Sequence, residues 1–246
     1  MIRPIIRTHN SKYHLALWIT QNFPSDYMQL GYIEPYVRAG GIFFNKQRSA
    51  DESINDADVG VIQIYRALRD EPGMFLGRLK RTKYCSNTFL KALKSKPSED
   101  YMDHAVSEFI ARRMSKGGHK KAFSEDDSLS WVSILEELPK IADRLQNVHI
   151  FNKLPIETLT AYNSKDIFAF VDPPPLAESV DVAEYEMSTY DHIKLWEVLN
   201  QFRGKVMISG SPSVLYRRLY HVDNGWKCIK KKTSVKTTID CLWVNY

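Results

Sequence analysis

The sequence predicts an α/β protein with a smaller helical insert, and three observations indicate it. Ile167–Val171 is a short, continuous apolar run between polar flanks, which is typical of a strand buried on both faces. Between residues 70 and 144, apolar side chains recur at helical spacing among dense charges. Near the C-terminus, segments 226–230 and 238–245 alternate in the manner of an antiparallel pair of strands.

The composition suits a folded protein with a mild basic excess, which is also common by chance. The chain has 246 residues, of which 43% are hydrophobic and 26% charged, and this is enough for a real core. The net charge of +5 is compatible with binding to a polyanion. The three cysteines form no CxxC pair, and no signal-peptide or membrane-length apolar run is present. We therefore expect a soluble, intracellular protein with no membrane partner.

A polar turn precedes the first expected helix. The helix-like stretch is Tyr13–Asn22, and either Asn10 or Ser11 could provide its N-terminal cap. Lys12 lies in the first turn, where a cation opposes the helix dipole. This lysine is therefore either solvated or placed for a ligand.

The next segment pairs a glycine turn with an acidic residue. Residues 32–44 indicate a strand, a turn at Gly40 and Gly41, and a further helix or strand. Adjacent glycines allow the backbone to approach a ligand closely. Asp56 then follows a short β-like segment, in the manner of acidic residues that bind ribose hydroxyls. Val59–Arg69 is predicted to form an amphipathic helix.

The expected helical insert, residues 70–144, contains a basic stretch at 112–123. Half of these twelve residues are Arg, Lys or His, accompanied by two glycines and one aromatic residue. Such a loop could hold phosphates, or it could be an ordinary solvated surface loop.

The C-terminal half supplies the remaining elements. Strands are expected at 147–152, 167–171 and 205–211, with a helix at 192–202 and a helical turn or two at 215–220. The lysines at 230–232 and 236 are interpreted as flanking a hairpin turn, where they favour solubility and protect a sheet edge.

Asp172 stops the buried strand at 167–171, and Pro173, Pro174 and Pro175 follow. Proline has no N–H and a fixed φ, so the strand cannot continue. A carboxylate and rigid backbone carbonyls are thereby placed at the carboxyl end of a core strand, which is where ligands bind in open α/β sheets. A strand that simply ends in a proline-rich turn is the alternative.

Several chemistries are not indicated. The sequence has no Gly-x-Ser-x-Gly elbow, no His-Glu-x-x-His and no Walker lysine loop. The seven histidines show no ligand spacing, so we expect no bound metal.

Six groups of residues, in order along the chain, resemble the motifs of one enzyme family. The groups are His9–Lys12 with Trp18, Ile19, Phe23 and Pro24; Tyr32–Tyr36 with Phe44–Lys46; Asn55 and Asp56 with Tyr65–Asp70; Asp172–Pro174; Met207–Gly210 with Leu215, Tyr216, Leu219 and Tyr220; and Leu242–Asn245. Together they resemble the Dam-like N6-adenine DNA methyltransferases that are common in phages and bacteria. The similarity covers nearly the whole chain.

The resemblance implies a Rossmann-like methyltransferase fold that binds S-adenosylmethionine and acts on double-stranded DNA. Residues 1–69 and 145–246 would form the catalytic domain, and the insert at 70–144 would recognise DNA. The cofactor-binding residues would be Thr8, Lys12, Glu34, Tyr36, Asp56, Asn152, Lys153 and Asp172. The DNA-binding residues would be Arg112, Arg113, Lys116, His119, Lys120, Lys121 and Tyr185.

In the implied mechanism, Asp172 and the Pro173 carbonyl bind the amino group of an extruded adenine. The catalytic segment would be Asp172, Pro173, Pro174 and Pro175, with Pro175 in place of the family's aromatic residue. This replacement and Arg38 within the glycine turn leave a second reading open. In that reading the chain keeps the fold and binds DNA or a protein partner without turnover. A third reading is methylation of another amino group, on cytosine N4 or on RNA.

Overall fold

A computed structural model describes residues 1–7, 11–95, 100–177, 186–232 and 239–246. The chain divides into two compact units. The first unit contains residues 1–20, 37–46 and 58–152, and the second contains residues 21–36, 47–57 and 153–246. The helix α2, Val59–Asp70, therefore belongs to the same compact unit as the predicted insert, although residues 59–69 were expected to be part of the catalytic domain.

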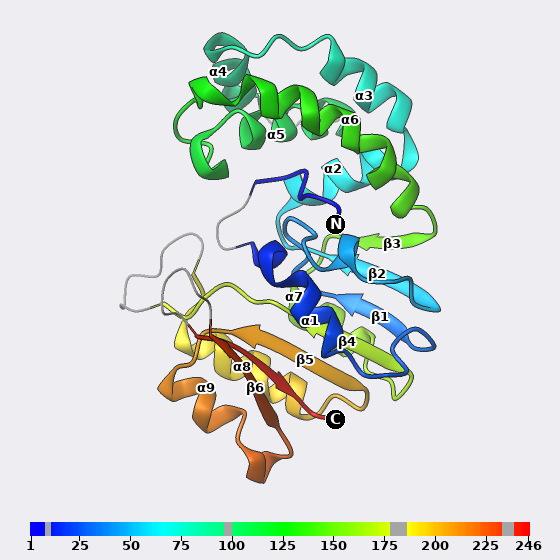
Figure 1. Cartoon of the computed structure of the whole chain (residues 1–246), viewed down its shortest axis with the longest axis vertical. Helices are drawn as coiled ribbons and strands as arrows, with labels where there is room; N and C mark the ends of the chain where they lie inside the picture. The colour runs from blue at the N-terminus through cyan, green and yellow to red at the C-terminus, as the bar shows by residue number, and fades with distance from the viewer. Residues whose placement is uncertain (8–10, 96–99, 178–185, 233–238) are drawn as a thin grey trace. The chain divides into compact units, whose positions relative to one another are not determined.

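The first unit is mainly helical (Figure 1). Its elements are η1 Lys12–Leu15, α1 Ala16–Gln21, η2 Phe43–Asn45, α2 Val59–Asp70, α3 Pro72–Lys80, α4 Ser86–Lys94, α5 Tyr101–Arg113, η3 Lys116–Gly118, η4 Glu125–Asp127, α6 Ser128–Arg144 and β3 Val148–Phe151. α2 packs against α5, and α3 against α6. The expected helical character of residues 70–144 is confirmed, because α3, α4, α5 and α6 lie within this range.

The second unit is an α/β sheet domain. Its elements are β1 Gly31–Glu34, β2 Asp51–Asn55, α7 Pro155–Ala161, β4 Ile167–Val171, α8 Thr189–Asn200, β5 Lys205–Gly210, α9 Val214–Leu219, η5 Val222–Asn224, β6 Lys227–Lys232 and β7 Ile239–Val244. The strands lie in the order β2-β1-β4-β5-β7-β6. The first four are parallel, whereas β7 is antiparallel to both β5 and β6. The predicted α/β class and the terminal antiparallel pair are confirmed.

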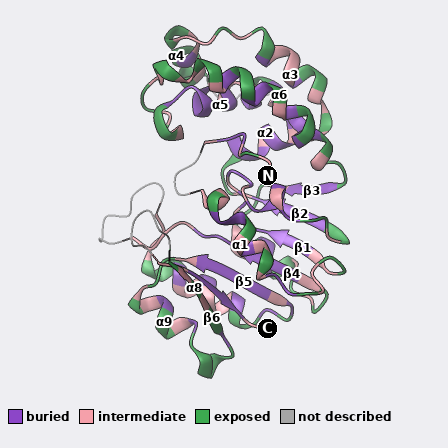
Figure 2. Cartoon of the chain, viewed as in Figure 1, coloured by how far each residue is buried: buried purple, intermediate pink, exposed green. Residues whose placement is uncertain are grey.

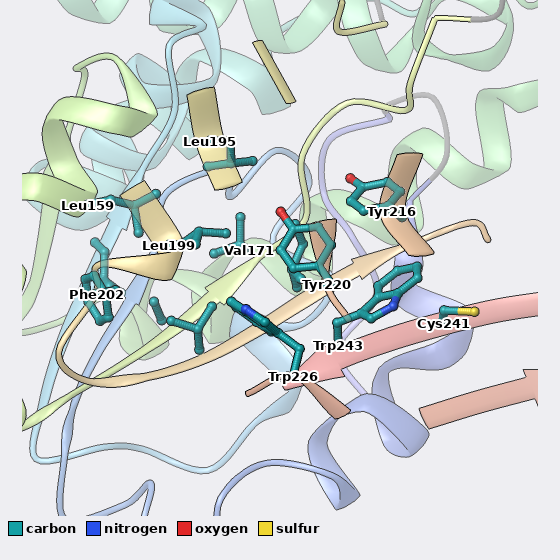
Figure 3. Packing of buried hydrophobic residues seen from close by; sticks show 14 residues of the cluster. Leu159, Val171, Leu195, Leu199, Phe202, Tyr216, Tyr220, Trp226, Cys241 and Trp243 are labelled. Atoms are coloured by element: carbon teal, nitrogen blue, oxygen red, sulfur yellow. The ribbon is translucent and has the colours of Figure 1, made fainter. Parts of the chain in front are cut away.

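The core strand β4 is buried on both faces, as the sequence predicts. Ala169 and Val171 point into a cluster with the helices α7, α8 and α9, shown in Figure 3. Phe168 and Phe170 point the other way, and both rings contact Phe23. Figure 2 accordingly shows the central strands as buried. Because both faces are covered, only the strand ends can offer side chains to a ligand.

Two side chains cap helices at their N-termini. Ser11 accepts a hydrogen bond from the Tyr13 amide, which confirms one of the two expected caps; Asn10 lies outside the described residues. Asp58 caps α2 by accepting from the amides of Gly60 and Val61, at 2.9 and 3.3 Å.

The predicted glycine turn contains two left-handed residues. Gly40 has φ 65° and Arg38 has φ 47°. This conformation favours glycine, so Arg38 is held in it at a steric cost. A Cβ on Gly41 would lie 3.1 Å from the backbone nitrogen of Tyr13. The close approach that Gly41 permits is therefore to the chain itself.

None of the helices in the described part of the chain combines the length and the apolar character that a membrane span requires.

Candidate active site

Three acidic residues lie at one edge of the sheet in the second unit. Glu34 ends β1, Asp56 follows β2 and Asp172 follows β4. These three strands are parallel neighbours in the order β2-β1-β4. Their carboxyl ends therefore lie side by side, about 4.8 Å apart from one strand to the next. In open α/β sheets this edge is the ligand-binding edge.

Asp172 is held by a side chain from the neighbouring strand. Its side chain is largely buried, with 9% of the residue exposed. The Ser209 hydroxyl on β5 donates a hydrogen bond to Oδ1 of Asp172. Ser209 is itself buried. A buried carboxylate oriented by a buried hydroxyl is pre-organised, because neither group can turn freely to water.

The proline segment after Asp172 is tied to the chain that enters α8. The Pro175 carbonyl accepts a hydrogen bond from the Met187 amide at 2.8 Å, and the Met187 carbonyl accepts one from Ala177 at 3.0 Å. Pro173 is buried, whereas Pro174 and Pro175 are half-buried. The proline segment is thus fixed by main-chain hydrogen bonds as well as by its ring geometry.

A buried histidine lies against this segment. His192 on α8 is fully buried, and its Nδ1 lies 3.2 Å from the hydroxyl of Tyr216. Burial lowers the pKa of His192 to about 4, although Asp191 and the carbonyls of Pro175 and Pro174 favour the charged form. Nε2 makes no hydrogen bond of good geometry within the described residues. His192 is therefore a neutral side chain at pH 7.

Tyr36 adds an aromatic side chain two residues beyond β1. It is half-buried, and its hydroxyl lies 4.0 Å from the sulfur of Met187. Burial, together with the nearby carboxylates of Asp56 and Asp191, raises the pKa of Tyr36 above its ordinary value. The phenol is consequently neutral and can act as a donor or an apolar surface.

Asn55 fixes two loops at this edge, a role that we did not predict. Its side-chain nitrogen donates to the carbonyls of Pro35 and Lys153, each at 3.0 Å. Its side-chain oxygen accepts from the Lys153 amide at 2.9 Å. Asn55 is fully buried. The sequence feature that could have indicated this role is the position of Asn55 at the end of β2, directly before Asp56.

The predicted cofactor residues divide between the two units. Glu34, Tyr36, Asp56, Lys153 and Asp172 lie in the second unit, at carboxyl ends of strands or in the loops that follow them. Lys12 and Asn152 lie in the first unit, where Lys12 begins η1 and Asn152 follows β3. Thr8 lies outside the described residues.

The interpretation of residues 112–123 as a loop is wrong for its first two members. Arg112 and Arg113 end α5, and both are buried. Arg112 forms ion pairs with Asp58 at 2.6 Å and with Glu108 at 3.1 Å. Arg113 donates to the Ser130 hydroxyl at 2.8 Å. These internal partners argue against the expected phosphate contacts, and the i,i+4 spacing of Glu108 and Arg112 was the overlooked signal.

The rest of the expected DNA-binding set is more exposed. Lys116, His119 and Lys121 are exposed around η3. Lys120 is half-buried and pairs with Glu108 at 3.2 Å. Tyr185 lies outside the described residues. A phosphate contact from this loop therefore depends on three side chains instead of six.

Metal ligation is not indicated by the geometry. Within the ranges that the structure describes, no three His, Cys, Asp or Glu side chains gather closely enough to hold a metal ion. The groups at the sheet edge are carboxylates, hydroxyls and carbonyl oxygens, which can accept hydrogen bonds from hydroxyl and amino groups of a ligand.

A family model described as D12 class N6 adenine-specific DNA methyltransferase matches residues 11–236. The match covers well over half of the chain and includes every element from η1 to β6. A comparison with curated proteins finds no match.

Proposed function

The chain belongs to the D12 class of N6 adenine-specific DNA methyltransferases, and from this premise we propose that Asp172 and the Pro173 carbonyl hold the amino group that is methylated. Enzymes of this class transfer a methyl group from S-adenosylmethionine to adenine in DNA. The single observation that supports the proposal most strongly is the buried Asp172 carboxylate, oriented by Ser209 at the carboxyl end of β4.

The chemistry requires two acceptors. The adenine amino group is a weak nucleophile because its lone pair is delocalised into the ring. The Asp172 carboxylate and the Pro173 carbonyl can each accept one N–H, which favours a pyramidal nitrogen with a localised lone pair. S-adenosylmethionine supplies an electrophilic methyl group on a sulfonium. Positioning and electrostatic stabilisation therefore provide the rate, and no covalent enzyme intermediate is needed.

The environment of Asp172 supports this role. The Pro173 carbonyl follows Asp172 directly, and it is the second acceptor that we propose for a substrate N–H. Pro173 has a fixed φ, and Pro174 after it restricts its ψ, so the direction of the Pro173 carbonyl is limited. The target base must leave the duplex to reach a largely buried carboxylate. We therefore propose double-stranded DNA as the substrate and base flipping as the mode of access.

We propose that the acidic and aromatic residues at the same sheet edge hold the cofactor. Asp56 is half-buried directly after β2, the position at which acidic residues accept hydrogen bonds from ribose hydroxyls. Glu34 is buried at the end of β1, where its Oε2 accepts from the Tyr32 hydroxyl at 2.7 Å. Tyr36 offers a neutral ring beside them. These carboxylates and the aromatic ring thus fit a ligand that carries hydroxyls and a positive charge.

The remaining predicted cofactor residues, Thr8, Lys12, Asn152 and Lys153, stay predictions. It also stays a prediction that residues 1–69 and 145–246 form the catalytic part and that residues 70–144 form the part that recognises DNA. Within the recognition part, the exposed Lys116, His119 and Lys121 are the side chains that we propose for phosphate contacts.

A methyl-transfer assay tests the proposal. The full chain is incubated with duplex DNA and S-adenosylmethionine labelled in its methyl group, and the DNA is digested to nucleosides. We expect label in N6-methyladenine for the wild type. Asp172→Ala should lose at least about a hundredfold in rate, as expected for a group that stabilises the reacting atoms.

Asp166→Ala is the matched control, because Asp166 is exposed and precedes the same strand at its opposite end. This variant should retain wild-type transfer. Full activity in Asp172→Ala would refute the assigned role, and label in N4-methylcytosine would refute adenine as the target. Calorimetry of S-adenosylmethionine binding separates loss of catalysis from loss of cofactor.

A further inference from the structure

We propose that the edge strand β6 is a contact surface for the DNA backbone, in which Lys230 and Lys232 bind phosphates of the duplex that is being methylated. This inference rests on the proposed function, because it assigns a second contact to the same substrate. It replaces the interpretation of these lysines as protection for a sheet edge.

The strand register places the two lysines at the catalytic edge of the sheet. Val171 of β4 pairs with Ile208 of β5, so the carboxyl ends of both strands lie together. Gly210 at the end of β5 pairs with Cys241 of β7, and Cys241 pairs with Lys230 of β6. Lys232 lies further along, opposite Ile239. β7 is antiparallel to both β5 and β6, so β6 runs in the same direction as β5. The lysine-rich carboxyl end of β6 therefore lies at the edge that carries Asp172.

The lateral separation suits a duplex. β6 is three strands away from β4 in the sheet order, which is roughly 14 Å at the usual strand spacing. The major groove of B-DNA alone is about 12 Å wide. A duplex with one base directed to Asp172 can therefore present backbone phosphates to β6.

The side chains on this end of β6 have the required exposure. Lys230 and Lys232 are both exposed, and they share one face of the strand because they are two residues apart. The same face carries Cys241 and Trp243 of β7, which pack in the cluster with Tyr216 of α9. Lys230 and Lys232 therefore project from the face of the sheet that is covered by α9.

The charge of the surrounding segment is strongly biased. α9 contributes the exposed Arg217 and Arg218. Asp223 is the single acidic residue between Ser211 and Lys232. A concentration of cations with one acid among them suits a polyanion, and phosphate contacts position a duplex without reading its sequence.

The test measures duplex binding as a function of salt. Fluorescence anisotropy follows a labelled DNA duplex titrated with the full chain between 50 and 200 mM salt. The variant is Lys230→Gln/Lys232→Gln. The matched control is Lys165→Gln/Arg203→Gln, which removes the same charge from two exposed residues at the opposite edge, before β4 and β5. Methyl transfer to the same duplex is measured in parallel.

We expect the β6 variant to lower the slope of log K against log salt by roughly 1.8, because each phosphate contact contributes about 0.9. Its affinity at the lowest salt should fall by roughly tenfold or more. KM for DNA should rise while kcat and binding of S-adenosylmethionine stay unchanged. The control should bind as the wild type does.

The outcomes separate this inference from the proposed function. If the wild type methylates the duplex but the β6 variant keeps its affinity and slope, the inference fails and the function stands. If both variants lose affinity equally, the effect is one of net charge and the inference fails. If the β6 variant alone loses binding while the wild type transfers no methyl group, the phosphate contact at β6 stands and the proposed function fails.

Discussion

The Ser209 hydroxyl on β5 donates a hydrogen bond to Oδ1 of Asp172, which follows β4. Both residues are buried, and they come from neighbouring parallel strands. A pair of this kind sets the direction of the carboxylate before any substrate arrives. The proposed role of Asp172 therefore depends on Ser209, which lies in the motif group Met207–Gly210 but was given no role of its own from the sequence.

Ser209→Ala should reduce methyl transfer without abolishing S-adenosylmethionine binding. A hydrogen bond to a charged group contributes about 1.5–3 kcal/mol, so kcat should fall by roughly 10- to 100-fold. Ser211→Ala, an exposed residue beyond β5, is the control. The decisive measurement is a double-mutant cycle with Asp172→Ala: if Ser209→Ala costs as much without Asp172 as with it, the two residues do not act together.

Pro175→Tyr should improve use of DNA, because an aromatic ring can stack on the flipped base where a proline ring stacks poorly. Stacking of a base on an aromatic side chain contributes about 1–3 kcal/mol. We expect KM for the duplex to fall between roughly 5- and 100-fold, measured by steady-state kinetics. Pro175→Ala, which lacks any ring, should raise KM, and equal values for Tyr and Ala at this position would contradict a stacking role.

His192 should make the folded state sensitive to acid. Its pKa is lowered to about 4 in the folded protein, against about 6.5 in the unfolded chain. The unfolded chain therefore binds the proton first, and the stability that the neutral ring contributes is present above pH 6.5 and lost as the pH falls towards 4. The loss should amount to about 3 kcal/mol of unfolding free energy.

Urea unfolding at a series of pH values measures this dependence. His192→Gln should flatten the decline between pH 6.5 and 4. A His192→Gln curve that declines as steeply as the wild type would show that another group is responsible.

Arg112→Met should destabilise the protein instead of weakening DNA contacts. Removing Arg112 leaves Asp58 and Glu108 without the guanidinium that joins α2 to α5. Breaking a buried pair costs about 3 kcal/mol, and the value should lie near this lower limit because Asp58 is partly exposed. Thermal or urea unfolding measures the loss.

Lys121→Met, on an exposed residue of the same basic stretch, is the comparison for Arg112→Met. It should change stability by less than about 0.5 kcal/mol. Under the proposed function it should lower the salt slope of duplex binding by about 0.9, whereas folded Arg112→Met should keep that slope. The opposite pattern would restore Arg112 as a DNA-binding residue.

The sequence by itself determined the elements and their order. The run at Ile167–Val171 predicted β4 because continuous apolar residues can only be buried on two faces. The prolines fixed where that strand ends, because they cannot donate to a sheet. The ordered motifs pointed to the family that the match over residues 11–236 establishes.

Only the tertiary structure decided which polar side chains meet. Ser209 and Asp172 are 37 residues apart in sequence, and no spacing rule joins them. Arg112 had the composition of a phosphate-binding residue, yet its side chain is paired with Asp58 from the start of another helix. Strand order placed Lys230 at the same edge as Asp172. Charge and hydrogen bonding depend on distance in space, whereas a sequence pattern fixes only local periodicity and backbone preference.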